Sequence, residues 1–251
     1  MTDPWYVGAG GRYAGPEPAF FDPADFPWVP LLEENWRVIR DELTGLVNAQ
    51  DQRLQPYFSR SLPFPPGGWK TMGLLFWGWR LHRNGRACPR TLAILRNIPH
   101  LVSASLSVLE PGANINPHQG DTNAVVRVHL GLVIPAGLPD CGFQVLDDIR
   151  SWQEGKTLLF CDAHSHTVWN QTDRRRLILL LDVLRPDFAD QSATVCTTVL
   201  SGNVLQMLEQ RFPVLKALPG DTRRRLQSVL SWLIGTARIL SGSARHRHGA
   251  S

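Results

Sequence analysis

The stretch VVRVHLGLVI at residues 125–134 decides the fold, because its apolar residues recur at every second position. Val126 and Val128 share one face of an extended chain, and Arg127 and His129 share the other. A period of two is typical of a β-strand, in which successive side chains point to opposite faces. The stretch therefore predicts a strand with one apolar face and one face that carries chemical groups.

Short segments of the same kind lie on both sides of this strand and are separated by turns rich in Pro, Gly and Asp. The predicted strands are 102–110, 125–134, 142–147, 156–161, 165–170 and 176–184. Six or more short strands at roughly regular intervals predict a sandwich or a barrel. The fold class is therefore mainly β, with flanking helices.

Helical periodicity appears only outside this β-rich region. The predicted helices are 31–49, 90–97, 204–211 and 222–240. Residues 1–30 are rich in Gly, Pro and aromatic residues, which predicts an irregular arm held in place by its rings. We expect one domain over residues 1–251, built from an arm and helices (1–100), a β core (101–186) and C-terminal helices (187–251).

Composition excludes several classes of protein. The 251 residues are 43% hydrophobic and 19% charged, as in a chain that buries a core. The net charge of +4 is too small to predict nucleic-acid binding. No apolar run reaches the ~18 residues of a transmembrane helix, and the first residues do not form a secretory signal. We therefore expect a cytoplasmic protein whose four cysteines are reduced.

A charged side chain that faces the inside of a barrel needs a partner or a ligand, because burial removes its hydration. Arg127 and His129 are such residues. In one interpretation Arg127 pairs with an internal Asp or Glu, and His129 is an ordinary core histidine. In the other, Arg127 binds an anion.

Two histidines far apart in the sequence are candidates for a metal site. His118 lies just before the central strand, and His166 lies on a later strand. Adjacent strands bring such residues together, and imidazole is a ligand for iron and other transition metals. His164 shares the parity of His166 but follows a turn, so we expect it close to the site or at the surface.

Arg176 opens the strand 176–184. An arginine that faces the interior at this point suits the far carboxylate of a dicarboxylic acid, since its planar guanidinium donates two parallel hydrogen bonds. Arg174 and Arg175 precede it, and a run of arginines is otherwise typical of a solvated loop.

Four motifs together resemble the aspartyl/asparaginyl β-hydroxylase family of iron(II)- and 2-oxoglutarate-dependent dioxygenases. These motifs are PGANINPHQGDTN (111–123), VRVHLGLVIP (126–135), RSWQEGKTLLFCDAHSHTVWN (150–170) and RRLILLLDVLRP (175–186). The resemblance covers most of residues 25–190.

The resemblance implies a double-stranded β-helix, which is a jelly-roll or cupin-like core, at residues 101–186. His118 and His166 would bind Fe(II). The residues that would bind 2-oxoglutarate are Ser107, Arg127, His129 and Arg176. Gly120 would stand where many related enzymes supply a carboxylate ligand, and Asp121 is the candidate for a third ligand.

The reaction implied by the resemblance is hydroxylation of an unactivated C–H bond with molecular oxygen. The first expected substrate is an amino acid, a peptide or another small natural product. The alternative is a lipid acyl chain at a membrane surface, for which the arginines and the apolar stripe of the helix at 222–240 are suited. Packing of that stripe on the barrel is favoured over membrane contact. Two further hypotheses are a cupin-like metal protein that uses no 2-oxoglutarate and a binding protein without catalysis.

Overall fold

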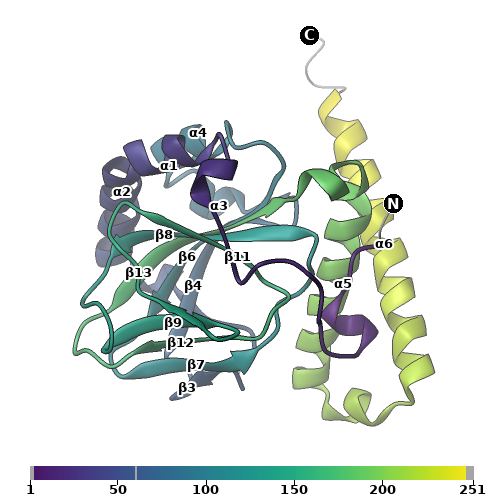
Figure 1. The fold of residues 1–251 in the computed structure, drawn as a ribbon. Helices are drawn as coiled ribbons and strands as arrows, with labels where there is room; N and C mark the ends of the chain where they lie inside the picture. Colours follow the sequence, from purple (N-terminus) through teal and green to yellow (C-terminus); the bar gives the residue numbers. More distant parts are fainter. Residues whose placement is uncertain (1–2, 60, 247–251) are drawn as a thin grey trace. The chain divides into compact units, whose positions relative to one another are not determined.

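The computed structural model describes residues 3–59 and 61–246, and the chain divides into two compact units, 1–189 and 190–251 (Figure 1). The first unit contains both β-sheets, and the second is helical. The prediction of a single domain stays a prediction. Among the described residues, no helix combines the length and the apolar character that crossing a bilayer requires. All four cysteines are buried thiols, as predicted.

Two antiparallel sheets form the first unit (Figure 1). The large sheet has eight strands, with β5 (Trp79–Arg80) paired to β4 and the others in the order β1 (Phe20–Phe21), β11 (Thr157–Cys161), β8 (Val125–Val133), β13 (Arg176–Leu184), β6 (Leu101–Leu109), β4 (Trp69–Phe76), β2 (Gln55–Pro56). The small sheet has five strands in the order β10 (Asp148–Arg150), β9 (Cys141–Val145), β12 (His166–Asn170), β7 (Ala113–His118), β3 (Pro63–Phe64).

From β6 onward the chain alternates between the two sheets, apart from the hairpin of β9 and β10. This alternation winds the strands into a double-stranded β-helix. The predicted fold class, mainly β with flanking helices around a jelly-roll core, is confirmed.

Helices cover the outer face of the large sheet because both surfaces are apolar. The helix predicted at 31–49 is split at Asn35 into α1 (Val29–Glu34) and α2 (Trp36–Ala49). On α2 the buried residues Ile39, Leu43 and Val47 recur every four positions and join the sheet in one apolar core, here called the outer core. Of the two shorter helices, α4 (Pro89–Leu95) contributes to this core and α3 (His82–Gly85) lies against β4.

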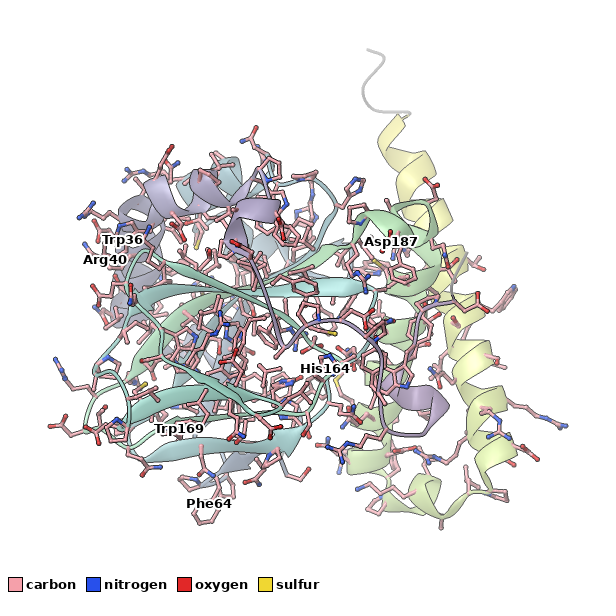
Figure 2. All side chains as sticks on the ribbon, in the orientation of Figure 1. Trp36, Arg40, Phe64, His164, Trp169 and Asp187 are labelled. Carbon is pink, nitrogen blue, oxygen red and sulfur yellow. The ribbon has the colours of Figure 1, made fainter. Side chains whose placement is uncertain are left out.

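The inner face of the large sheet looks toward the small sheet and is mixed in character. Phe143, Trp152 and Phe160 belong to a second, separate apolar cluster, here called the inner core. Side chains fill the space between the two sheets (Figure 2). Arg127 and His129 lie on the inner side of β8, on the parity that the sequence predicts to carry the chemical groups.

Some boundaries differ from the prediction where local sequence is misleading. β7 is absent from the prediction because its Asn and Pro residues are typical of a loop. α5 (Ser192–Arg211) begins well before residue 204. The prediction began too late because the first half of this helix is rich in β-branched residues, which lower helix propensity. In the second unit, α6 (Gly220–His246) extends the predicted helix at both ends, and Arg223 pairs with Glu209 of α5.

The N-terminal arm is ordered by its rings, as the composition predicts. Tyr13 lies with its ring centroid 5.3 Å from that of His164. Tyr6 forms a β-bridge with Thr122. The arm therefore lies directly against the segment that follows His118.

Candidate active site

His118 and His166 meet on adjacent strands of the small sheet. They are register partners on β7 and β12, and their ring centroids lie 4.2 Å apart. In each ring Nδ1 lies 2.8 Å from a backbone oxygen, that of Asn116 for His118 and that of His164 for His166. Because a carbonyl oxygen only accepts, Nδ1 carries the proton and Nε2 keeps its lone pair for a metal. The structure thus brings the two predicted ligands together.

Both rings are held in the neutral form that binds metals. Burial lowers the pKa of His118 to about 4, although the hydrogen bond to the Asn116 carbonyl opposes this effect. Burial lowers the pKa of His166 well below its ordinary value, and the neighbouring His118 adds to the shift. Two neutral imidazoles therefore share one site at pH 7.

His164 supports this site without joining it. Its Nε2 lies 2.7 Å from the backbone oxygen of Glu17 in the N-terminal arm, so the ring is directed to the arm (Figure 2). Its own carbonyl is the partner of His166 Nδ1. The expectation that His164 lies near the histidine pair is confirmed.

The carboxylate of Asp162 occupies the space that a side chain at residue 120 would fill. A Cβ atom on Gly120 would overlap this carboxylate, and the Gly120 amide donates to the Asp162 backbone oxygen at 2.7 Å. Asp162 Oδ1 lies 3.8 Å from His166 Nε2. The site therefore has a carboxylate beside the two histidines, and it comes from the segment after β11 rather than from residue 120.

Asp162 is the residue that sequence reasoning missed, because it reads as the first residue of a turn. It is fully buried. The available signal was its position directly after the apolar strand TLLFC (157–161), where a charged residue that continues into a buried segment needs a partner.

Arg127 is that partner. Its Nε lies 2.7 Å from Asp182 Oδ1 and its Nη2 lies 3.3 Å from Asp182 Oδ2, while Nη1 forms an ion pair with Asp162. Burial disfavours the charge on Arg127, but the two carboxylates outweigh burial and raise its pKa. Burial also raises the pKa of Asp162, although Arg127 opposes the shift. Arg127 is thus paired internally, as in the first of its two interpretations, and its predicted contact with 2-oxoglutarate stays a prediction.

Asp121 adjoins the site through its backbone. Its N–H donates to Asp162 Oδ2 at 3.1 Å, and its carbonyl accepts from Val7 at 3.1 Å. In the part of the chain that the structure describes, no three His, Cys, Asp or Glu side chains are grouped to bind one metal ion. The two histidines lie together, and Asp121 as a third ligand stays a prediction.

Arg176 is a buried cation with open hydrogen-bonding capacity. It is 1% exposed, yet its Nε and Nη1 have no hydrogen-bond partner. Its guanidinium carbon lies 4.7 Å from the ring centroid of Trp152, a cation–π contact. Burial lowers the pKa of Arg176 to about 10, so the group is still charged at pH 7. Because unpaired buried N–H groups are unfavourable, this position is suited to an anion.

Ser107 and His129 lie on the two strands that flank β13, which carries Arg176. The indole of Trp69 donates to Ser107 Oγ at 3.0 Å, and that of Trp152 donates to His129 Nδ1 at 3.3 Å. Burial, and then Arg176, lower the pKa of His129 well below its ordinary value. A neutral ring that accepts at Nδ1 carries its proton on Nε2. The Ser107 hydroxyl and His129 Nε2–H can therefore donate to an anion.

The structure is a cupin-like barrel whose interior holds a histidine pair and a separate buried arginine. The chain belongs to the aspartyl/asparaginyl β-hydroxylase family, since the model of that family matches residues 33–186. Membership confirms the resemblance found in the sequence.

Two relatives illustrate the range of the family. The ornithine lipid ester-linked acyl 2-hydroxylase of Rhizobium tropici is 36% identical over 173 residues, which cover 67% of this chain and 61% of the relative. The aspartyl/asparaginyl β-hydroxylase of Homo sapiens is 32% identical over 175 residues, which cover 65% of this chain and 22% of the relative. The chain therefore spans less than two thirds of the length of either relative.

Among solved structures, a prolyl-4-hydroxylase from Pseudomonas putida is similar with a TM-score of 0.43 and 15% identity. The similarity covers 62% of this chain and 98% of that one.

Proposed function

We propose that this chain is an Fe(II)- and 2-oxoglutarate-dependent dioxygenase that hydroxylates an unactivated C–H bond with molecular oxygen. The observation that carries the proposal is Arg176, whose buried Nε and Nη1 have no hydrogen-bond partner among the described residues. Arg176 and the histidine pair share one interior, because Phe143 packs on both His166 and Trp152. A dicarboxylate between the two places satisfies the guanidinium and adds ligands to a metal held by only two side chains.

The residues of the chain then have distinct tasks. His118 and His166 hold the iron through Nε2, and Asp162 keeps a carboxylate beside them. Arg176, Ser107 and His129 bind and orient the cosubstrate carboxylates. When bound, iron and 2-oxoglutarate supply the oxidative chemistry, in which oxygen is activated as 2-oxoglutarate becomes succinate and CO2 and a C–H bond becomes C–OH.

The inner core protects this chemistry from water. Phe143, Phe160 and Trp152 are all buried and lie in contact around His129. Exclusion of water strengthens the electrostatic interactions of the charged residues in the site and limits side reactions. We propose a small or peptidyl substrate as the first class, in line with the aspartyl and asparaginyl substrates in the name of the human relative.

A lipid acyl chain is the second candidate substrate, and a specific observation favours it. α6 exposes Val229, Trp232 and Leu233, which are 56%, 68% and 50% exposed and share one side of the helix. Arg224 and Arg225 precede them and are exposed. A Trp-containing apolar side next to arginines is typical of a helix that lies at a membrane surface. The name of the Rhizobium relative specifies a lipid acyl chain.

The decisive test of the cofactors is anaerobic addition of Fe(II) and 2-oxoglutarate, followed by visible charge-transfer absorption. We expect the band in the wild-type chain and its loss in Arg176→Met, with Fe(II) binding retained. Arg174→Met is the matched control, since Arg174 is exposed and opens the same arginine run. Iron binding without any response to 2-oxoglutarate contradicts the proposal and supports a cupin-like metal protein. Absence of iron binding supports a non-catalytic binding protein.

The substrate classes are separated by mass spectrometry of products from peptides and from lipid vesicles. If the substrate is a vesicle lipid, Trp232→Glu/Leu233→Glu lowers its turnover and Val214→Glu, at an exposed site outside α6, does not. A product formed from soluble peptides with equal rates in all three proteins supports the first class instead.

A further inference from the structure

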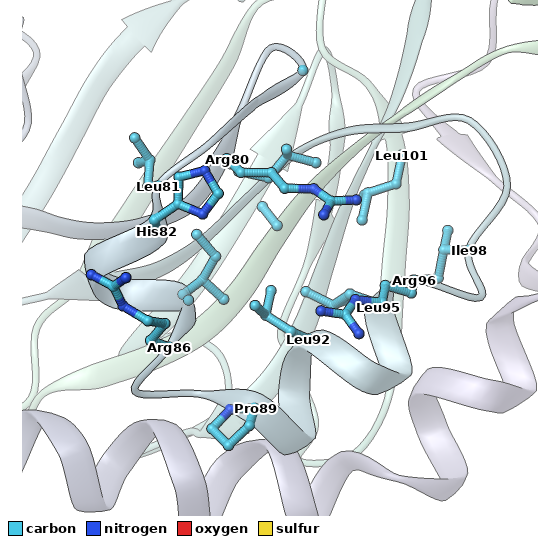
Figure 3. Close-up of a pocket in the computed structure, with 15 residues that line it drawn as sticks. Arg80, Leu81, His82, Arg86, Pro89, Leu92, Leu95, Arg96, Ile98 and Leu101 are labelled. Carbon is cyan, nitrogen blue, oxygen red and sulfur yellow. The ribbon is translucent and has the colours of Figure 1, made fainter. Parts of the chain in front are cut away.

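A cavity of about 630 Å³ lies outside the barrel interior, between β4, β5 and β6 on one side and the helices α3 and α4 on the other (Figure 3). Its volume is in the range of small-molecule sites. Its apolar lining includes Leu74, Leu92, Leu95 and Leu101. All four belong to or pack against the outer core, and none belongs to the inner core around the histidines. The cavity is therefore a second, separate concavity.

The polar part of the lining is entirely basic or neutral. Arg80, Arg86 and Arg96 line the cavity together with His82, and no Asp or Glu does. In the described part of the chain none of the three guanidinium groups takes part in an ion pair. Figure 3 shows Arg80 on the strand side and Arg96 at the end of α4, with Leu92 and Leu95 beside Arg96.

The charge distribution along the chain supports the same conclusion. Residues 52–109 contain eight of the 26 Lys and Arg but none of the 22 Asp and Glu. The remaining residues therefore have 18 basic against 22 acidic side chains. The cavity is lined from within the longest segment of the chain that has no acidic residue, which favours an anionic ligand.

The floor of the cavity is suited to a chain of methylene groups. Leu74 and Leu95 are 2% and 3% exposed, so the cavity reaches into the packed core. Arg80 and Arg96 are exposed and lie at the solvent side. An apolar floor with cations at its opening matches a molecule that has an apolar tail and an anionic head.

We propose that this cavity is a binding site for a single-chain anionic amphiphile, such as a fatty acid or an alkyl phosphate, with the head at Arg80 and Arg96 and the tail against Leu74, Leu92 and Leu95. The proposal does not depend on the reaction proposed above, because none of these residues belongs to the histidine site. Free amphiphile rather than a bilayer is the source, since a cavity of about 630 Å³ accepts one chain and a bilayer surface presents many.

The test is calorimetric titration of the full chain with decanoate below its micelle concentration. Decanol is the uncharged match, and acetate is the match without a tail. We expect decanoate to bind at least tenfold more tightly than decanol, and acetate to give no signal. Arg80→Glu/Arg96→Glu should weaken decanoate binding at least tenfold.

The control variant is Arg83→Glu/Arg90→Glu, which makes the same charge change in the same segment at exposed residues that do not line the cavity. It should bind decanoate within twofold of the wild-type chain, and circular dichroism should show both variants folded. Equal binding of decanol and decanoate, or equal losses in the two variants, overturns the proposal. The proposal is also overturned if decanoate does not bind but the chain sediments with phosphatidylglycerol vesicles and this sedimentation depends on Arg80 and Arg96.

Discussion

The two faces of the large sheet are made by the same strands but follow different rules. On β8 and β13 the outer parity places Val128, Leu130 and Leu179 in the outer core, all fully buried. The inner parity of the same strands places His129 and Arg176 among aromatic rings. The outer face can be understood from buried apolar area alone, whereas the inner face holds groups that folding by itself disfavours.

Magnitudes make the contrast concrete. A fully buried Leu on the outer face contributes about 1.5–3 kcal/mol. An uncompensated buried charge on the inner face has a penalty of several kcal/mol. The inner face is thus unfavourable for stability in the absence of a ligand and favourable for binding. Substitutions at His166, Leu130, Arg176 and Trp152 test this division.

The largest effect is expected at His166, one of the two proposed iron ligands. His166→Ala removes one of the two Nε2 atoms proposed to bind iron, so 2-oxoglutarate-dependent oxygen consumption should fall by more than ~100-fold. This loss should exceed the loss seen when a residue that only hydrogen-bonds to a metal ligand is changed. Oxygen-electrode assays and iron titration measure it. Urea unfolding should show the variant still cooperatively folded. Near-normal turnover would remove His166 from the site.

A substitution on the outer face should lower stability strongly without changing 2-oxoglutarate binding. Leu130→Ala, one residue from His129, deletes a fully buried side chain of the outer core and should lower the free energy of unfolding by about 2–5 kcal/mol. Below its unfolding temperature, the variant should keep the wild-type affinity for 2-oxoglutarate. Weaker cosubstrate binding by this variant would show that the two faces are not independent.

Arg176→Met should raise the free energy of unfolding of the ligand-free protein and weaken its binding of 2-oxoglutarate. Replacing an unpaired buried guanidinium by an apolar chain of similar length should raise the free energy of unfolding of the ligand-free protein by about 1–4 kcal/mol. Arg176→Lys should weaken 2-oxoglutarate binding roughly 10- to 100-fold, because a charged hydrogen bond contributes about 1.5–3 kcal/mol. Denaturant titration and calorimetry measure the two quantities.

Arg174→Met is the control for both measurements, as it changes the same residue type two positions earlier on the surface. If Arg176→Met destabilises the ligand-free protein, Arg176 has a structural partner and the contrast between the faces fails.

The smallest effect concerns a single hydrogen bond. Trp152→Phe keeps the ring near Arg176 but removes the N–H that donates to His129 Nδ1, so 2-oxoglutarate affinity should fall by a factor of about 2–10, equivalent to roughly 0.5–1.5 kcal/mol. Trp169→Phe removes a comparable indole hydrogen bond, to the Pro139 carbonyl, on the outside of the barrel. Calorimetry should find the wild-type 2-oxoglutarate affinity in Trp169→Phe. An equal loss of affinity in both variants would mean that the hydrogen bond from Trp152 to His129 has no specific role.

Alternation along the chain was sufficient to predict which side of each long strand faces inward. Arg127 and His129 lie on the inner side, and the two histidines were found because imidazoles on separate strands are rare enough to stand out. The inward parity of Arg127 and His129 could be predicted because a period of two depends only on neighbouring residues.

What the sequence could not provide was the pairing between distant charges. Arg127 has Asp162 and Asp182 as partners, and those contacts depend on the register of β8 against β11 and β13. An isolated strand gives no information about register. For the same reason Arg127 and Arg176 look equivalent in the sequence, although one is neutralised by two carboxylates and the other by none.

The shared space of Gly120 and Asp162 makes these two positions interdependent. Any side chain at 120 competes with a carboxylate that already pairs with Arg127. A single Gly120→Asp exchange therefore crowds two acids into one volume, and a single Asp162→Gly exchange leaves that volume empty. Only the double substitution Gly120→Asp/Asp162→Gly moves the carboxylate from one segment to the other and keeps the number of carboxylates in the site constant. Mutational scans that change one position at a time will therefore miss the coupling between residues 120 and 162.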